Sequence, residues 1–331
     1  MCKIFNKTLI KLKKIKFINL FLIISLSFLM LSSSLYSQSI ARWGLPYIKN
    51  YYPYEYNGYS QNWDIAFDNT GILWLANGDG LMSFDGINWH KYFLPTNDAI
   101  ASIVIDNDRI YVGSKNEFGY FLISNPKTYK YVSLTSKAKN LSFSNNYFLS
   151  TAKTNYGIYL SDNNSVVRLI NDKVDVLFTN VKGNLINFNN LAFFYNPKTG
   201  LYLLSGSKLL YIKGNYPLNS QIFMFLPYTN DTLLIIDAAA GIYKGILNID
   251  NISSPTLNIE EIDFPIEKEL LQNNILDAKK SSDSYIFSTY FGGTYVYDLD
   301  FNLQYILNHS SQLISLTHNK IALDPNENIW L

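Results

Sequence analysis

The chain has 331 residues, 48% of which are hydrophobic, and a formal net charge of +1. Its single cysteine is Cys2, so the rest of the chain has no thiol for a disulfide framework, a cysteine-ligated zinc site or a cysteine nucleophile. A chain of this length can bury a large core without such cross-links.

The first 37 residues are expected to be a secretory signal peptide and not part of the fold. Six lysines precede an apolar run from Phe17 to Leu31, and a short polar stretch to Ser37 follows. An uncleaved anchor is the alternative, because the run is only slightly short for a membrane span. The leader holds six of the 27 basic residues and none of the 26 acidic ones, so residues 38–331 carry a net charge of −5. This balance argues against nucleic-acid binding.

A short pattern of glycine, usually an aliphatic residue, and then an aromatic residue or methionine recurs through the remaining chain. Its glycines follow one another at intervals of 39, 38, 43, 41 and 52 residues: Gly80, Gly119, Gly157, Gly200, Gly241 and Gly293. A repeat of about forty residues that is built of short strands is typical of a β-propeller, with one four-stranded blade per repeat. The sequence therefore predicts an all-β propeller.

The clearest repeat predicts strands at 63–67, 72–76, 81–84 and 87–92. Turns at 68–71, 77–80 and 85–86 separate them, because Asp, Asn and Gly favour tight chain reversals. The next repeat predicts strands at 100–105 and 109–113. In the later repeats the second strands are expected at 147–151, 191–195, 233–237 and 285–289. A short turn of helix is expected within 262–272.

The last residues, 321–331, predict one strand, a turn and the beginning of a second strand. Six units and the start of a seventh are therefore expected, with seven blades in the complete protein. An unpaired strand edge invites aggregation, which favours a continuation of the chain. Residues 41–59 are hypothesised to supply a strand that closes the ring against the last blade.

The segment FDNTGILWLANGDGLMSFDG resembles the two-component regulator propeller repeat, and DPNENIWL resembles the start of another copy. The positions that carry the pattern are Asp68, Gly71, Leu73, Trp74, Leu75, Ala76, Gly80 and Leu81. The resemblance implies the exported, periplasmic sensor region of a bacterial signalling protein, tethered to the inner membrane in the full-length protein. It also implies an extracellular ligand, often a glycan, and a dimer formed through a C-terminal region that is missing here. Kinase or DNA-binding output cannot be carried over to this chain.

Other chemistry is not indicated. The histidines His90, His309 and His318 lack a metal-ligand spacing, and the acidic stretch at Asp298 and Asp300 lacks the glycine and glutamate of a calcium loop. No metal, cofactor or catalytic residue is therefore predicted. Carboxylates paired across loops, as in sialidase-type propellers, would be the enzymatic alternative.

Ligand-binding candidates come from the turns between second and third strands, which open on the face that commonly binds ligands. Asn77, Asp79, Asn116 and Glu117 could hydrogen-bond sugar hydroxyls, and Tyr290 or Phe291 could stack on a sugar face. The loop at 238–240 lies in the corresponding place. The alternative is that all of these are ordinary turn and packing residues. Two other functions stay open: a free periplasmic protein-binding scaffold, and a propeller-fold glycosidase or lyase.

Overall fold

The computed structural model describes residues 46–125, 127–141, 146–216, 223–229, 231–237, 241–251, 253–262 and 267–331. All described strands belong to the compact unit Tyr47–Leu331. The predicted leader, residues 1–37, lies outside the described residues, as does the loop at 238–240.

The described strands form six sheets of four or five strands and one sheet of two strands, which we number as blades 1 to 7 in chain order. Blade 1 contains β1 (Asn62–Phe67), β2 (Leu73–Asn77), β3 (Gly80–Phe84) and β4 (Trp89–Tyr92). Blade 2 contains β5 (Ile100–Asp106), β6 (Arg109–Ser114), β7 (Glu117–Asn125) and β8 (Thr128–Ser133). Blade 3 contains β9 (Ser150–Thr154), β10 (Gly157–Ser161), β11 (Val166–Ile170) and β12 (Lys173–Phe178).

Blade 4 contains β13 (Asn184–Phe188), β14 (Leu191–Asn196), β15 (Gly200–Ser205) and β16 (Lys208–Tyr211). Blade 5 contains β18 (Phe223–Thr229), β19 (Thr232–Asp237), β20 (Gly241–Asn248) and β21 (Thr256–Glu261), and β17 (Lys213–Gly214) pairs parallel with β21. Blade 6 contains β22 (Ile275–Lys280), β23 (Ser284–Thr289), β24 (Thr294–Asp298) and β25 (Leu303–Leu307). Blade 7 is the antiparallel pair β26 (Ala322–Leu323) and β27 (Ile329–Trp330). The α-helices in the described ranges are α2 (Pro53–Tyr56) and α3 (Glu267–Gln272).

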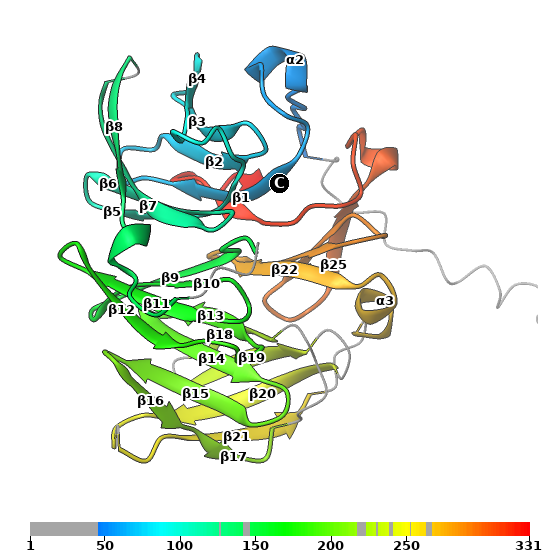
Figure 1. The fold of residues 1–331 in the computed structure, drawn as a ribbon. Coiled ribbons are helices and arrows are strands. Elements are labelled where there is room, and N and C mark those ends of the chain that lie inside the picture. Colours follow the sequence, from blue (N-terminus) through cyan, green and yellow to red (C-terminus); the bar gives the residue numbers. More distant parts are fainter. Residues whose placement is uncertain are drawn as a thin grey trace, which may run out of the picture. The chain divides into compact units, whose positions relative to one another are not determined.

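The first strand of each blade faces the first strands of its neighbours. Contacts link β1, β5, β9, β13, β18 and β22 in this order, and β26 contacts β1. Between blades 6 and 7 the backbone N–H of Ile321 donates to the Asp277 carboxylate over 2.9 Å. The predicted propeller is thus confirmed, with the red C-terminal strands lying beside β1 (Figure 1). The predicted helix within 262–272 is confirmed as α3, between blades 5 and 6.

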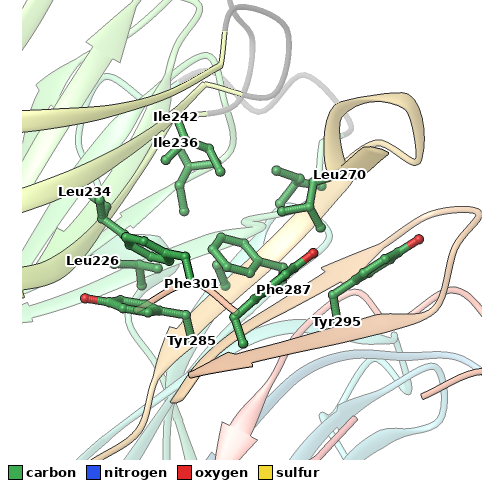
Figure 2. Packing of buried hydrophobic residues seen from close by; sticks show 12 residues of the cluster. Leu226, Leu234, Ile236, Ile242, Leu270, Tyr285, Phe287, Tyr295 and Phe301 are labelled. Atoms are coloured by element: carbon green, nitrogen blue, oxygen red, sulfur yellow. The ribbon is translucent and has the colours of Figure 1, made fainter. Parts of the chain in front are cut away.

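The hydrophobic core is divided among the interfaces between successive blades. Between blades 5 and 6, Leu234 and Ile236 of β19 pack against Tyr285 and Phe287 of β23, and Leu270 of α3 covers the cluster (Figure 2). Comparable clusters fill the other interfaces. Strands with apolar residues on both faces suit this arrangement, because each sheet is covered on both sides.

The glycine of the repeat marks a close approach of two strands. A Cβ at Gly80, Gly119 or Gly293 would stand 2.7, 2.2 or 2.2 Å from a carbonyl oxygen of the following strand. No side chain fits within such a distance, so glycine is required there. Gly157 meets the same constraint, at 2.4 Å, but at the start of a second strand.

The prediction for the third repeat was therefore wrong. We expected its second strand at 147–151, whereas β9 (Ser150–Thr154) is the first strand of blade 3 and Gly157 opens the second. Glycine is required wherever a carbonyl comes this close, whether in a second or in a third strand. The sequence pattern therefore placed Gly157 in a third strand, although it opens the second.

Asp68 and Trp74 are six residues apart, and the β1–β2 turn explains this spacing. The Asp68 carboxylate accepts hydrogen bonds from the backbone of Thr70 and Ile72, and from the Trp74 indole nitrogen at 2.9 Å. Partial burial raises the pKa of Asp68, but these hydrogen bonds outweigh it and hold the pKa below its ordinary value.

The same turn occurs twice more. Asp324 accepts hydrogen bonds from the backbone of Asn326 and Asn328 and from the Trp330 indole nitrogen at 3.4 Å. Asp298 accepts one from the Gln304 amide, which again stands six residues later. Burial raises the pKa of both carboxyls, yet hydrogen bonds lower it overall.

Blade 7 contacts blade 1 at the point where the ring closes. We call this interface between blades 7 and 1 the seam. The Asn319 amide donates to the Asn62 carbonyl over 3.1 Å. On the other side of blade 7, Lys320 Nζ lies 3.7 Å from Oδ1 of Asp277 in blade 6, and this carboxylate and that of Asp64 in blade 1 raise the pKa of Lys320. Burial raises the pKa of Asp64, and the charge of Lys320 opposes that shift.

The predicted closing strand at 41–59 is not found among its described residues, 46–59, which instead contain α2. Their place is nevertheless at the seam. The Tyr51 ring stacks on Trp330 with centroids 5.8 Å apart, and it contacts Phe84 edge-on at 5.3 Å. The aromatic rings fill the interface between blades 1 and 7 without adding a strand.

Replacing Trp74 with Phe should lower the free energy of unfolding by roughly 1.5 kcal/mol, because it removes a hydrogen bond to a charged carboxylate. Urea denaturation would measure this change in the free energy of unfolding. Trp89→Phe is the matched control, since the Trp89 indole donates no hydrogen bond within the described part of the chain. Equal losses in the two variants would contradict the proposed role of the Asp68 turn.

Acid should weaken the fold through the turn carboxylates. Their folded-state pKa values lie below the ordinary value of 3.8, so their stabilisation is complete above that pH and is lost as the pH falls through the folded-state pKa. We expect Asp298→Asn to show a smaller loss of stability than the wild type between pH 5 and pH 2, measured by urea denaturation at each pH. An unchanged pH dependence would show that the Asp298 turn does not contribute.

Candidate ligand-binding pocket

A cavity of about 360 Å³ lies where the chain enters the first strands of blades 1, 2 and 3. Tyr59, Gln61 and Trp63 line it from blade 1, together with Gly78 and Asp79 of the β2–β3 turn. Ala99 and Ala101 line it from blade 2, and Tyr147 and Leu149 from the entrance to blade 3.

Apart from Gly78 and Asp79, the lining residues come from three segments of the chain and lie two residues apart in each. The pairing of β1 with β2 shifts at Trp63, and the pairing of β5 with β6 shifts at Ala101, so both first strands are irregular where they meet the cavity. Blade 2 contributes only the small side chains of Ala99 and Ala101. They leave space between Tyr59 and Trp63 on one wall and Tyr147 on the other.

Asn77 holds the first wall in place. Its side chain is fully buried, and its oxygen accepts hydrogen bonds from the backbone N–H of Tyr59 at 3.0 Å and of Asp79 at 2.9 Å. Its nitrogen donates to the carbonyls of Tyr59 and Gln61 and to the Asn62 side chain. Asn77 was predicted to bind the ligand itself, but its polar atoms are occupied by the protein, so we assign it a positioning role.

Gly78 leaves room for the Tyr59 ring. A Cβ at this position would stand 2.5 Å from Tyr59 Cδ1, closer than non-bonded carbon atoms can approach. The backbone N–H of Gly78 also donates to the Gln61 carbonyl over 3.2 Å. The β2–β3 turn therefore fixes two of the cavity's lining residues.

Asp79 is the predicted candidate that lines the cavity directly. Its side chain is 43% exposed, and Lys91 Nζ lies 3.2 Å from its Oδ2 atom. Among the described residues that line the cavity, Asp79 is the one carboxylate, and none is Lys, Arg or His. The charge in the lining is therefore negative.

Asn116 and Glu117 occupy the corresponding turn of blade 2 but are not cavity-lining residues. The Tyr131 hydroxyl donates to Glu117 over 2.7 Å, and burial together with this carboxylate raises the pKa of Tyr131. The backbone N–H of Asn116 donates to the Asn146 carbonyl, while its side-chain oxygen is buried without a hydrogen-bond partner among the described residues.

Tyr290 and Phe291 form a separate aromatic surface on blade 6. Both side chains are exposed, and their rings meet edge to face with centroids 4.6 Å apart. The backbone N–H of Tyr290 donates to the Asn274 carbonyl, which holds the turn. The structure thus brings two of the six predicted residues, Asn77 and Asp79, to the cavity and leaves the other four elsewhere.

Sequence reasoning missed Tyr59, Trp63 and Tyr147 as members of one site. The signal that could have found them is the spacing of Tyr59, Gln61 and Trp63 at the start of one blade and of Ala99 and Ala101 at the start of the next. Finding it requires the correct start of blade 3, which the glycine pattern obscured.

No group of acidic, histidine or cysteine side chains suited to a metal ion occurs within the described ranges. Among the helices of those ranges, none has the length and hydropathy needed to cross a membrane.

Asn77→Ala should lower the free energy of unfolding by roughly 2 to 3 kcal/mol, because it strands several buried hydrogen-bonding groups. Hydrogen exchange at the Tyr59 amide should accelerate as well. Asn69→Ala, which truncates an exposed turn side chain, serves as the control for urea denaturation and exchange. If Tyr59 keeps its protection in Asn77→Ala, the positioning role is wrong.

Comparison with known proteins gives structural matches only. No protein-family model and no curated protein matches the chain. The extracellular domain of the one component system BT4673 from B. thetaiotaomicron is 18% identical, with a TM-score of 0.56 over 81% of this chain and 37% of that one. The extracellular domain of the hybrid two component system BT3049 from the same organism is 13% identical, with a TM-score of 0.58 over 86% and 40%. The chain therefore spans about two fifths of the length of these domains.

Virginiamycin B lyase from Staphylococcus aureus is also similar in fold, with 13% identity and a TM-score of 0.55 over 78% of this chain and 87% of the enzyme. The shared architecture therefore occurs in extracellular domains of one- and two-component systems and in an enzyme, and it does not decide between these functions. The chain has the β-propeller fold found in extracellular domains of bacterial one- and two-component systems, in agreement with the sequence resemblance.

Proposed function

We propose that the chain is the exported, ligand-sensing propeller of a bacterial signal-transduction protein, and that its ligand binds in the cavity between blades 1, 2 and 3. The observation that carries this proposal is the aromatic-lined cavity itself. Ligand sites are typically concave, mostly apolar and equipped with a few polar groups. Tyr59, Trp63 and Tyr147 supply the apolar walls, and Gln61 and Asp79 supply the polar groups.

A glycan suits this lining. Aromatic rings can stack on the apolar face of a sugar ring, while the Gln61 amide and the Asp79 carboxylate can hydrogen-bond its hydroxyls. Hydrolysis of the glycan is not part of the proposal. A glycosidase generally needs two carboxyl groups that flank the scissile bond, and one carboxylate is found among the described lining residues.

Signalling requires the ligand to favour one conformation over another. The cavity wall offers a route, because Asn62 lies between the lining residues Gln61 and Trp63 and accepts a hydrogen bond from Asn319 at the seam through its backbone carbonyl. We propose that an occupied cavity changes the seam between blades 1 and 7. That change would then reach the polypeptide that follows Leu331 and bias a dimer formed through it, across the inner membrane.

Screening of the purified protein against a panel of glycans tests the proposal. Trp63→Ala should weaken binding at least tenfold, about 1.4 kcal/mol, because it removes one aromatic wall. Tyr54→Ala, which truncates a side chain that is 78% exposed outside the cavity, should leave the affinity unchanged. An affinity that is the same in Trp63→Ala and in the wild type would place the ligand elsewhere, with the Tyr290–Phe291 surface as the next region to test.

A further inference from the structure

The cavity's lining discriminates between ligands by charge. We propose that its ligand carries an ammonium group, which lies between the aromatic rings and takes Asp79 as its counter-ion. This inference rests on the proposed ligand-binding role of the cavity and specifies the chemistry of what enters it.

The aromatic walls are the first part of the argument. Tyr59, Trp63 and Tyr147 are 57%, 37% and 37% exposed, so ring surface is available to a ligand. A cation near the face of an aromatic ring is attracted by the ring's electron-rich face, and sites with several rings are a known means of binding ammonium groups. Ala99 and Ala101 keep the space between the walls open.

The second part is the unbalanced charge of the lining. Asp79 contributes a carboxylate, and the described part of the lining includes no basic side chain that could receive an anion. A carboxylate or sulfate group on a ligand would therefore meet like charge, which is costly in a recessed site. An ammonium group would meet opposite charge.

Lys91 does not cancel this preference. Its Nζ atom approaches one oxygen of Asp79, Oδ2, over 3.2 Å, and Lys91 itself is not a lining residue. Within the described part of the chain, the other oxygen, Oδ1, accepts no hydrogen bond. Lys91 thus orients the carboxylate and leaves one oxygen for the ligand.

Two sources could provide such a ligand: an amino sugar, or a small quaternary amine. Each has a matched neutral counterpart, namely glucose for glucosamine and 3,3-dimethylbutan-1-ol for choline. Titration calorimetry of the purified protein with all four probes at about pH 6, where the sugar amine is protonated, separates the effect of charge from the effect of shape. We expect at least one ammonium probe to bind ten times more tightly than its neutral counterpart.

Two substitutions of opposite effect sharpen the test. Asp79→Asn, which keeps the shape of the side chain, should reduce the tenfold preference to about twofold or less. Lys91→Met removes the competing cation and should strengthen binding of the ammonium probe by a few-fold. Tyr290→Ala, outside the cavity, is the control and should change neither.

Equal affinity for charged and neutral members of both pairs would overturn the inference, as would failure of both ammonium probes to bind at millimolar concentration. In either case the proposed function survives if a glycan binds and Trp63→Ala weakens it. If Trp63→Ala has no effect on any ligand, the ligand-binding role of the cavity fails as well.

Discussion

The structure depends on the closure of a ring of sheets. Each blade buries both faces against its neighbours, so the first blade is covered only if the last one reaches it. In this chain Trp330 packs on Tyr51 and Phe67, and the Asn319 amide donates to the Asn62 carbonyl across the seam. A propeller that joined its ends within one sheet would close through backbone hydrogen bonds. The described strands of this chain close through side chains.

This mode of closure brings structure and proposed function together. The residues before and within β1 make two sets of contacts. Tyr59, Gln61 and Trp63 line the cavity, and the Asn62 backbone carbonyl accepts a hydrogen bond from Asn319 of the last blade. One short segment therefore contacts both the proposed ligand site and the part of the ring nearest to the end of the chain.

The turn chemistry and the strand pattern could be predicted from sequence because their causes are local. Asp68 and Trp74 are six residues apart, and the turn between them brings the indole to the carboxylate. Strand positions in blades 1 and 2 followed from turn residues and were confirmed within two residues. The strands of blade 3 were misplaced by one. Gly157 is required by a carbonyl of the next strand, and the sequence pattern alone does not tell which strand of the blade that is.

By itself the sequence determined the all-β class, the six repeats with the beginning of a seventh, and Asp79 as one candidate for ligand contact. Tertiary structure decided where these residues lie. Asn77 is buried and hydrogen-bonded to the backbone of Tyr59, and Tyr147 lines the same cavity as Tyr59, although the two are 88 positions apart in the chain. Local turns depend on neighbours in sequence, whereas a cavity depends on which strand of each blade faces the centre of the ring, and only the closed ring fixes that.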